Sequence, residues 1–204
     1  MKRKPNKRAV TLLVCLTVLA TAAVGTTLAY LFASTPTVKN AFLPARVTCS
    51  VEEAFDGSTK SNVQLRNTGN TDAYIRAAVV VTWKNSAGEV YAAAPAEGTD
   101  YSISWNLSAT GWVKADDSFC YYTKEVAPCT HTDGQAHNGC LTAVLIDTCS
   151  PVSGKAPQGY TLSVEIVASA IQSAPDAVVG GQWSNAKVSV AGSNGTLTVT
   201  NLGG

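Results

Sequence analysis

The chain has 204 residues, of which 46% are apolar, 14% charged and 7% aromatic. This length suits one domain of ordinary size, and the apolar fraction excludes a fully disordered chain. The charge is unevenly placed, because five of the 15 basic residues lie in the first eight positions. From residue 30 onward, ten basic and 14 acidic side chains leave a net charge of −4. A mildly acidic body without a basic stripe binds nucleic acid poorly, so we expect no nucleic-acid partner.

The first element in chain order is an export signal. After the basic cluster, no charged residue occurs from Ala9 to Val38, and most of this stretch is apolar. A basic segment followed by an apolar helix and small residues is typical of a secretory signal peptide. The sequence therefore predicts a protein secreted to the outside of the cell or to its surface.

The cleavage site is predicted from the small residues at the end of the apolar run. Thr27-Leu28-Ala29 fits signal peptidase, which would cut between Ala29 and Tyr30 and remove a signal helix over residues 1–29. Signal peptidase is then a partner during export, and the membrane is contacted only through the N-terminal segment before cleavage. The alternative is an uncleaved anchor, because the apolar stretch 9–33 is long enough to span a bilayer.

The body shows the two-residue period of β-strands. Apolar and polar residues alternate near 47–52, 101–107 and 160–170, and residues 74–83 are expected to form one long strand with two faces. Further strands are expected at 119–122 and 141–147. Turn sequences such as Asp56-Gly57 separate these runs, and no amphipathic helical pattern is found after residue 44. Because side chains of a strand point to opposite faces in turn, the pattern predicts an all-β fold with half-buried antiparallel strands, a sandwich or barrel.

Composition divides the exported chain into three segments. Residues 30–44 form a leader that ends in a proline, and residues 45–172 form the sandwich. Residues 173–204 form a linker and a small hairpin, which either adds to the sandwich or hangs free. The leader mixes apolar, β-branched and aromatic residues, which makes it a candidate donor strand.

Several stretches resemble the TasA/camelysin family of secreted proteins from Gram-positive bacteria. They are Gly25–Tyr30 followed by Asn40-Ala41-Phe42, and the segments 63–85, 112–128 and 159–172. The most specific stretch is the turn Asn67-Thr68-Gly69-Asn70 with the following Asp72-Ala73-Tyr74-Ile75-Arg76. The resemblance implies export by a dedicated type of signal peptidase and a jelly-roll-like antiparallel β-sandwich. It also implies a role in the extracellular or biofilm matrix, in which subunits join by donating an N-terminal strand to a neighbour.

The leader could act in this way because cleavage would free residues 30–42. An extended segment can pair with an open sheet edge and satisfy its backbone groups. The alternative is a disordered terminus or a strand that pairs within its own fold. We therefore expect a structural protein that self-associates into fibres or joins related matrix proteins. The alternatives are a surface-anchored binding or adhesion module and a camelysin-like secreted metallopeptidase.

Catalytic signatures are not found in the sequence. A zinc peptidase usually carries His-Glu-x-x-His, whereas this chain has only two histidines, His131 and His137, and no predicted helix to hold them. The chain also lacks a nucleophile elbow, a phosphate loop and a dinucleotide fingerprint. We therefore expect no enzyme, no catalytic residue and no cofactor.

Both histidines lie between Cys129 and Cys140. Two thiolates and two imidazoles would suit a closed, structural zinc site formed by Cys129, His131, His137 and Cys140. A disulfide between the two cysteines is the other possibility, and export to an oxidising environment favours it. We expect the disulfide and keep the zinc site as the alternative.

Five cysteines remain after cleavage of the signal, which are Cys129, Cys140 and the three others Cys49, Cys120 and Cys149. Cys49 lies on the inward face of its strand, and Cys149 follows the apolar run 141–147. The family resemblance favours a disulfide between Cys49 and Cys149. Cys120 lies in an aromatic strand, where a buried free thiol is the ordinary outcome and an intermolecular bridge is the alternative.

Overall fold

The computed structural model describes residues 7–8, 11–17, 45–107, 109–129, 138–174 and 176–203. Residues 7–8 and 11–17 are helical. Among the described residues, no helix is both long and apolar enough to cross a bilayer. The predicted cleavage site at Ala29 and Tyr30 and the candidate donor strand 30–44 lie outside the described residues.

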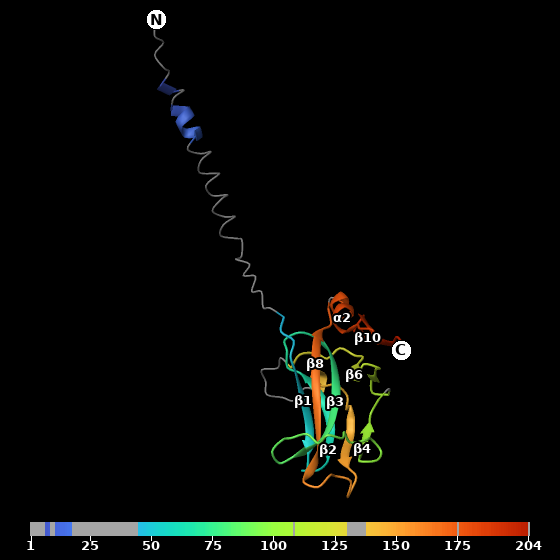
Figure 1. Ribbon diagram of the computed structural model, residues 1–204. Coiled ribbons are helices and arrows are strands. Elements are labelled where there is room, and N and C mark those ends of the chain that lie inside the picture. Colours follow the sequence, from blue (N-terminus) through green and yellow to red (C-terminus); the bar gives the residue numbers. More distant parts are fainter. Residues whose placement is uncertain are drawn as a thin grey trace. The chain divides into compact units, whose positions relative to one another are not determined.

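The body consists of two four-stranded antiparallel sheets and a separate hairpin (Figure 1). Sheet 1 has the order β1-β2-β7-β4, and sheet 2 has the order β5-β6-β3-β8. The two sheets face each other across a common core, so the expected antiparallel all-β fold is confirmed. The strands of sheet 1 are β1 (Cys49–Phe55), β2 (Lys60–Asn67), β4 (Tyr101–Trp105) and β7 (Ile146–Pro151). Those of sheet 2 are β3 (Ala73–Asn85), β5 (Trp112–Lys114), β6 (Phe119–Tyr122) and β8 (Tyr160–Gln172).

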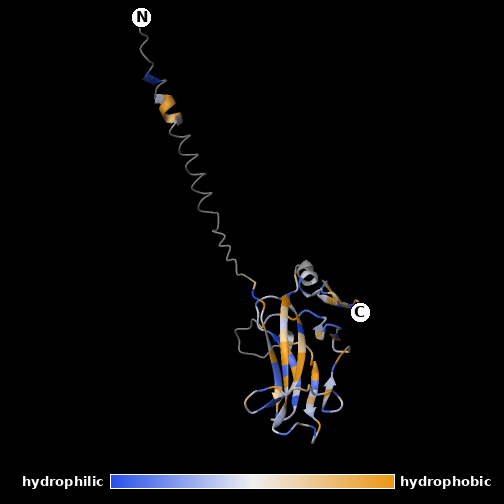
Figure 2. Cartoon of the chain, in the orientation of Figure 1, coloured by the Kyte–Doolittle hydropathy of each residue, from blue (hydrophilic) through white to orange (hydrophobic). Residues whose placement is uncertain are grey.

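The alternation read from the sequence separates the two faces of each strand. In β3, Ile75 and Ala77 point into the core and are fully buried, while their neighbours Tyr74 and Arg76 point to the other face of sheet 2. Hydrophobic residues are prominent along the two long strands β3 and β8 (Figure 2). The main core contains Val63, Leu65, Ile75, Ala77, Tyr101, Trp112, Cys120, Tyr122, Val126, Leu145, Ile146 and Cys149.

One strand boundary differs from the prediction. Residues 141–147 were expected to form a strand, but β7 begins only at Ile146. The preceding segment instead bonds irregularly along β2, where Thr142 N–H donates to Leu65 O (2.8 Å) and Leu145 N–H donates to Val63 O (2.8 Å). Burial of Leu145 explains the apolar run without regular strand geometry.

The C-terminal segment forms a further layer on the outer face of sheet 2. It contains the helix α2 (Asp176–Trp183) and the hairpin β9 (Val188–Ser193) and β10 (Thr196–Asn201). The predicted hairpin is therefore present, and it packs on the sandwich instead of hanging free. Asn194 and Gly195 both have positive φ (52° and 76°), as a type I′ hairpin turn requires. The second core contains Tyr74, Ala115, Tyr121, Ile171, Trp183, Val188, Val190 and Leu197.

Periodicity did not reveal α2, because the helix has only eight residues, two of them glycine, and no distinct apolar face. Its last residue, Trp183, is 3% exposed and lies edge-on to Tyr121, with ring centroids 5.6 Å apart. A short glycine-containing helix has little stability of its own. Tertiary packing around Trp183 therefore stabilises the helix.

Arg76 joins the C-terminal layer to sheet 2. Its guanidinium carbon lies 4.0 Å from the Phe119 ring centroid and 4.9 Å from that of Trp183. Arg76 Nη1 donates to the Tyr121 hydroxyl (3.1 Å), which donates to Asp117 Oδ2 (2.6 Å). Burial, reinforced by the Asp117 hydrogen bond, raises the pKa of Tyr121 to about 12. A cation between aromatic faces thus holds the two layers together.

Replacing Trp183 with alanine should lower the free energy of unfolding by about 3–5 kcal/mol, because a large buried ring leaves a cavity. Backbone amides of β9 and β10 should exchange faster while those of β3 and β8 keep their protection. Denaturant unfolding and hydrogen exchange measure both effects. Leu202→Ala is the matched control, because Leu202 is 52% exposed in the same segment. Equal exchange in all layers of Trp183→Ala would contradict the assignment of a separate C-terminal layer.

Candidate functional site

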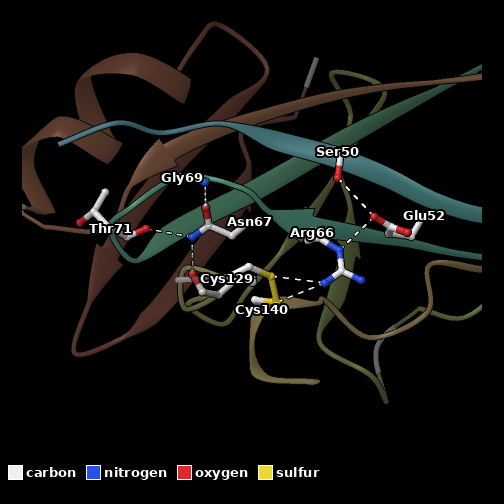
Figure 3. The surroundings of a disulfide bond; sticks show 9 residues. Ser50, Glu52, Arg66, Asn67, Gly69, Thr71, Cys129 and Cys140 are labelled. Atoms are coloured by element: carbon white, nitrogen blue, oxygen red, sulfur yellow. Dashed lines mark hydrogen bonds and ion pairs between the residues drawn. A yellow bond between two sulfur atoms is a disulfide. The ribbon is translucent and has the colours of Figure 1, made fainter. Parts of the chain in front are cut away.

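Asn67 organises the end of β2 where the disulfide lies (Figure 3). Its buried amide nitrogen donates to Thr71 O and Val126 O, both at 2.8 Å, and its Oδ1 accepts from Gly69 N–H (2.9 Å). A side chain on Gly69 would collide with the carbonyl oxygen of Arg46, so the close approach of the backbone requires glycine. The turn on which the family resemblance rests most specifically therefore depends on two residues. Asn67 forms hydrogen bonds with backbone groups, and Gly69 leaves room for the backbone of Arg46.

The predicted disulfide between Cys129 and Cys140 is present, with Cα atoms 5.2 Å apart. The N–H of Cys129 donates to Asn67 O (3.2 Å), which attaches this end of the loop to β2. Cys140 is 2% exposed, whereas Cys129 is half-buried. Disulfides of this kind persist in oxidising compartments, so the bond points to an oxidising environment for the body.

Arg66 lies directly against the disulfide. Its Nη1 is 3.3 Å from Cys129 Sγ and 3.5 Å from Cys140 Sγ, while its Nε donates to Glu52 Oε1 at 2.9 Å (Figure 3). Ser50 Oγ donates to the same Glu52 oxygen at 3.4 Å. A row of polar side chains on β1 and β2 therefore ends at the two sulfur atoms. Sequence reasoning missed Arg66, because 63 residues separate it from Cys129.

The alternative zinc site would combine Cys129 and Cys140 with the two histidines of the chain. His131 and His137 lie outside the described residues. With their sulfurs bonded to each other, Cys129 and Cys140 offer no pair of thiolates to a metal in this oxidised state. Among the described residues, no group of three or more histidine, cysteine and acidic side chains is placed to hold a metal ion.

The predicted disulfide between Cys49 and Cys149 is wrong, because both are free thiols. Cys49 pairs with Asn67 at one end of β1 and β2, whereas Cys149 pairs with Lys60 at the other end. The offset of six to seven residues corresponds to roughly 20 Å at about 3.3 Å per residue. A disulfide needs Cα atoms closer than about 7 Å, so the strand register forbids this bridge.

Cys120 is a buried free thiol, as expected from its aromatic strand. Burial raises the pKa of Cys120 and of Cys149 to about 11. Cys49 is half-buried, and burial raises its pKa as well. The reactive thiolate form is therefore scarce at neutral pH, and the two core thiols act as small apolar residues.

The flank of the sandwich between β1 and β8 is incompletely covered. Within the described residues, β8 bonds to β3 along one side over all 13 residues, and no strand pairs with its other side. Its inward row packs against the main core and stays half-buried along its whole length, whereas the inward row of β3 is fully buried at Ile75 and Ala77 and half-buried at Val79 and Val81. The half-buried row consists of Leu162, Val164, Ile166, Ala168 and Ala170.

A cleft of about 330 Å³ lies on this flank where β1 ends and β8 begins. Phe55 of β1, 62% exposed, and Leu162 of β8 contribute apolar surface to it. Lys60 also lines the cleft and is paired with Glu53 at 2.7 Å. The open flank therefore combines a free strand edge with accessible apolar side chains.

The opposite flank is closed by side chains. Lys114 of β5 lies with its ammonium 4.7 Å from the Trp105 ring centroid, and Trp105 Nε1 donates to Glu97 Oε1 at 3.0 Å. Trp105 belongs to β4, so these contacts bridge the two sheets at their other edge. These three side chains line a pocket of about 220 Å³, together with residues of the core such as Val81 and Cys120.

Comparisons with protein-family models, with curated proteins and with solved structures found no match to this chain. The likeness to TasA/camelysin proteins therefore rests on the quoted stretches of sequence alone.

The core thiols should resist alkylation in the folded protein. At pH 8.5 a thiol with a pKa of about 11 is about 0.3% thiolate, whereas a free cysteine is about half ionised, so iodoacetamide should label Cys120 and Cys149 more than a hundredfold more slowly than in urea. Their labelling rates should rise up to about pH 11. A short pulse with peptide mass spectrometry measures this, and the half-buried Cys49 should label faster. Equal rates in folded and urea-unfolded protein would contradict the assigned burial.

Proposed function

We propose that this protein is a secreted structural subunit of the cell surface or extracellular matrix that assembles by donating its N-terminal strand to a neighbour. The observation that carries the proposal is the open flank at β8. A long, regular edge strand with an uncovered apolar row is a template for pairing with another chain. Natural proteins usually protect such edges with bulges, proline or inward-pointing charges.

The two edges beside the open flank differ in this protection. β1 has a register shift between Glu52 and Ala54, and the charged Lys60 lies opposite its last residue. β8 contains no proline and pairs with β3 without a register shift. Its only charged residue, Glu165, is paired with Lys84. The edge of β8 is therefore the more suitable acceptor.

The strand order supports the same acceptor position. In a jelly roll numbered along the chain, strand 1 pairs with strand 8, and the sheets have the orders 1-8-3-6 and 2-7-4-5. The orders 8-3-6 and 2-7-4 occur here, but β1 pairs with β2 and β5 pairs with β6. The described residues thus resemble a jelly roll whose first position beside β8 is open. A donated strand at that position would complete the fold.

Residues 30–42 are the proposed donor. If export removes residues 1–29, this segment becomes a free N-terminus that contains Tyr30, Leu31, Phe32 and Phe42. Its apolar side chains would cover the half-buried row of β8, while its backbone would pair with the strand edge. Each subunit would give one strand and receive one, a head-to-tail contact that builds a filament. The resemblance to TasA/camelysin proteins supports both the export signal and the assembly.

Deleting residues 30–42 from the mature chain should abolish fibres while leaving a folded β-rich body. Replacing Leu31 and Phe32 with aspartate should weaken assembly more than the same change at Thr35 and Thr37, because a charged side chain cannot enter an apolar acceptor site. Electron microscopy and sedimentation of protein beginning at Tyr30 measure the outcome. A mature protein that stays monomeric across concentration and pH would refute strand donation.

Hydrogen exchange can identify the acceptor strand. On assembly, alternate amides of β8 should gain protection, because every second N–H of an edge strand points away from its antiparallel partner. The edge of β4 on the closed flank serves as the control and should not change. Protection of β8 by residues 30–42 in the isolated monomer would instead show that the leader completes its own sandwich.

A further inference from the structure

The contact between Arg66 and the disulfide has a chemical consequence that is independent of assembly. A guanidinium has N–H donors and a permanent positive charge, and the sulfur of a neutral disulfide is only a weak acceptor. A thiolate is a much better partner, because hydrogen bonds between charged groups are about twice as strong as neutral ones. Arg66 therefore stabilises the sulfur atoms more after reduction than before it.

The direction of the effect follows from thiol chemistry. A nearby cation lowers the pKa of a cysteine and increases its thiolate fraction. A disulfide whose reduced form is stabilised has a higher reduction potential and is reduced more easily. Arg66 Nη1 lies within 3.5 Å of both sulfurs, so it can stabilise the thiolate of either cysteine.

We propose that Cys129–Cys140 is a redox-active disulfide that exchanges with a dithiol partner, such as a thiol oxidoreductase with a Cys-x-x-Cys site. The structure favours Cys129 as the attacked residue, because it is half-buried while Cys140 is 2% exposed. Arg66 is a positioning residue that stabilises the leaving sulfur.

The exchange proceeds in two steps. A thiolate of the partner attacks Cys129 Sγ and forms a mixed disulfide, while the Cys129–Cys140 bond breaks and Cys140 leaves with the electron pair as a thiolate beside Arg66. The second thiolate of the partner then attacks the partner's first sulfur in the mixed disulfide, and Cys129 leaves as a thiolate. The partner loses two electrons and becomes a disulfide, and its two thiol protons pass to the cysteines or to water.

Glu52 provides an opposing charge at the same site. Its carboxylate pairs with Arg66 Nε at 2.9 Å, and it reduces the positive potential that the sulfurs experience. Removing the positive charge of Arg66 should therefore favour the disulfide, and removing the negative charge of Glu52 should favour the dithiol. A purely structural role would shift both variants in the same direction, because each loses one ion-pair partner.

The test is the equilibrium of the mature protein with defined ratios of reduced and oxidised dithiothreitol. Arg66→Gln should shift this equilibrium about tenfold toward the disulfide, which corresponds to about 30 mV in reduction potential. Glu52→Gln should shift it toward the dithiol. Arg46→Gln is the matched control, because Arg46 donates to Thr68 O at the same end of the sheet and has no hydrogen bond to either sulfur.

A second readout uses the reduced protein. The pH profile of alkylation at Cys129 and Cys140 should move to higher pH in Arg66→Gln and return toward the original profile in Arg66→Lys, which keeps the charge. Circular dichroism checks that each variant is folded. An unchanged equilibrium in Arg66→Gln, or a shift of Glu52→Gln in the same direction, would overturn the proposal. Neither result depends on whether the protein forms fibres.

Discussion

The buried amide of Asn67 is the interaction on which this end of the sandwich depends. It joins two stretches of chain through three hydrogen bonds, because it bonds to its own turn at Gly69 and Thr71 and to the distant Val126. An unpaired amide in this position would be costly, whereas a satisfied one specifies a single arrangement. The start of β1, the β2–β3 turn and the loop that carries Cys129 all meet here. The disulfide and the proposed redox chemistry therefore rely on the hydrogen bonds of Asn67.

The strands β3 and β8 of sheet 2 are buried to different extents. Near its first residues, β3 is buried on its inward face by the main core and on its outward face by the C-terminal layer. β8 shares that outer cover at Ile171, but its inward row is only half-buried. A long strand edge without a register shift and a half-buried apolar row thus coincide on one strand. This coincidence is the physical basis for assigning the acceptor to β8.

The two proposals concern different chemistry at separate places. Strand donation would act along the inward row of β8, whereas the disulfide lies beside Arg66 with Glu52 and Ser50 as neighbours. Backbone pairing and apolar burial govern the first, and charge governs the second. In the redox proposal, Glu52 acts through its charge, because it pairs with the arginine that contacts the sulfur atoms.

The sequence by itself determined the features that depend on neighbouring residues. The two-residue period identified both faces of β3 and β8, and a small hairpin was predicted within residues 173–204, because strand period and turn geometry are local properties of the chain. The pairing of Cys129 with Cys140 was also accessible, since only a short loop separates them. The tertiary structure decided what depends on register and distant packing. It separated Cys49 from Cys149, stabilised α2 through Trp183, and brought Arg66 to the disulfide, because such contacts join residues whose separation along the chain carries no information about their distance in space.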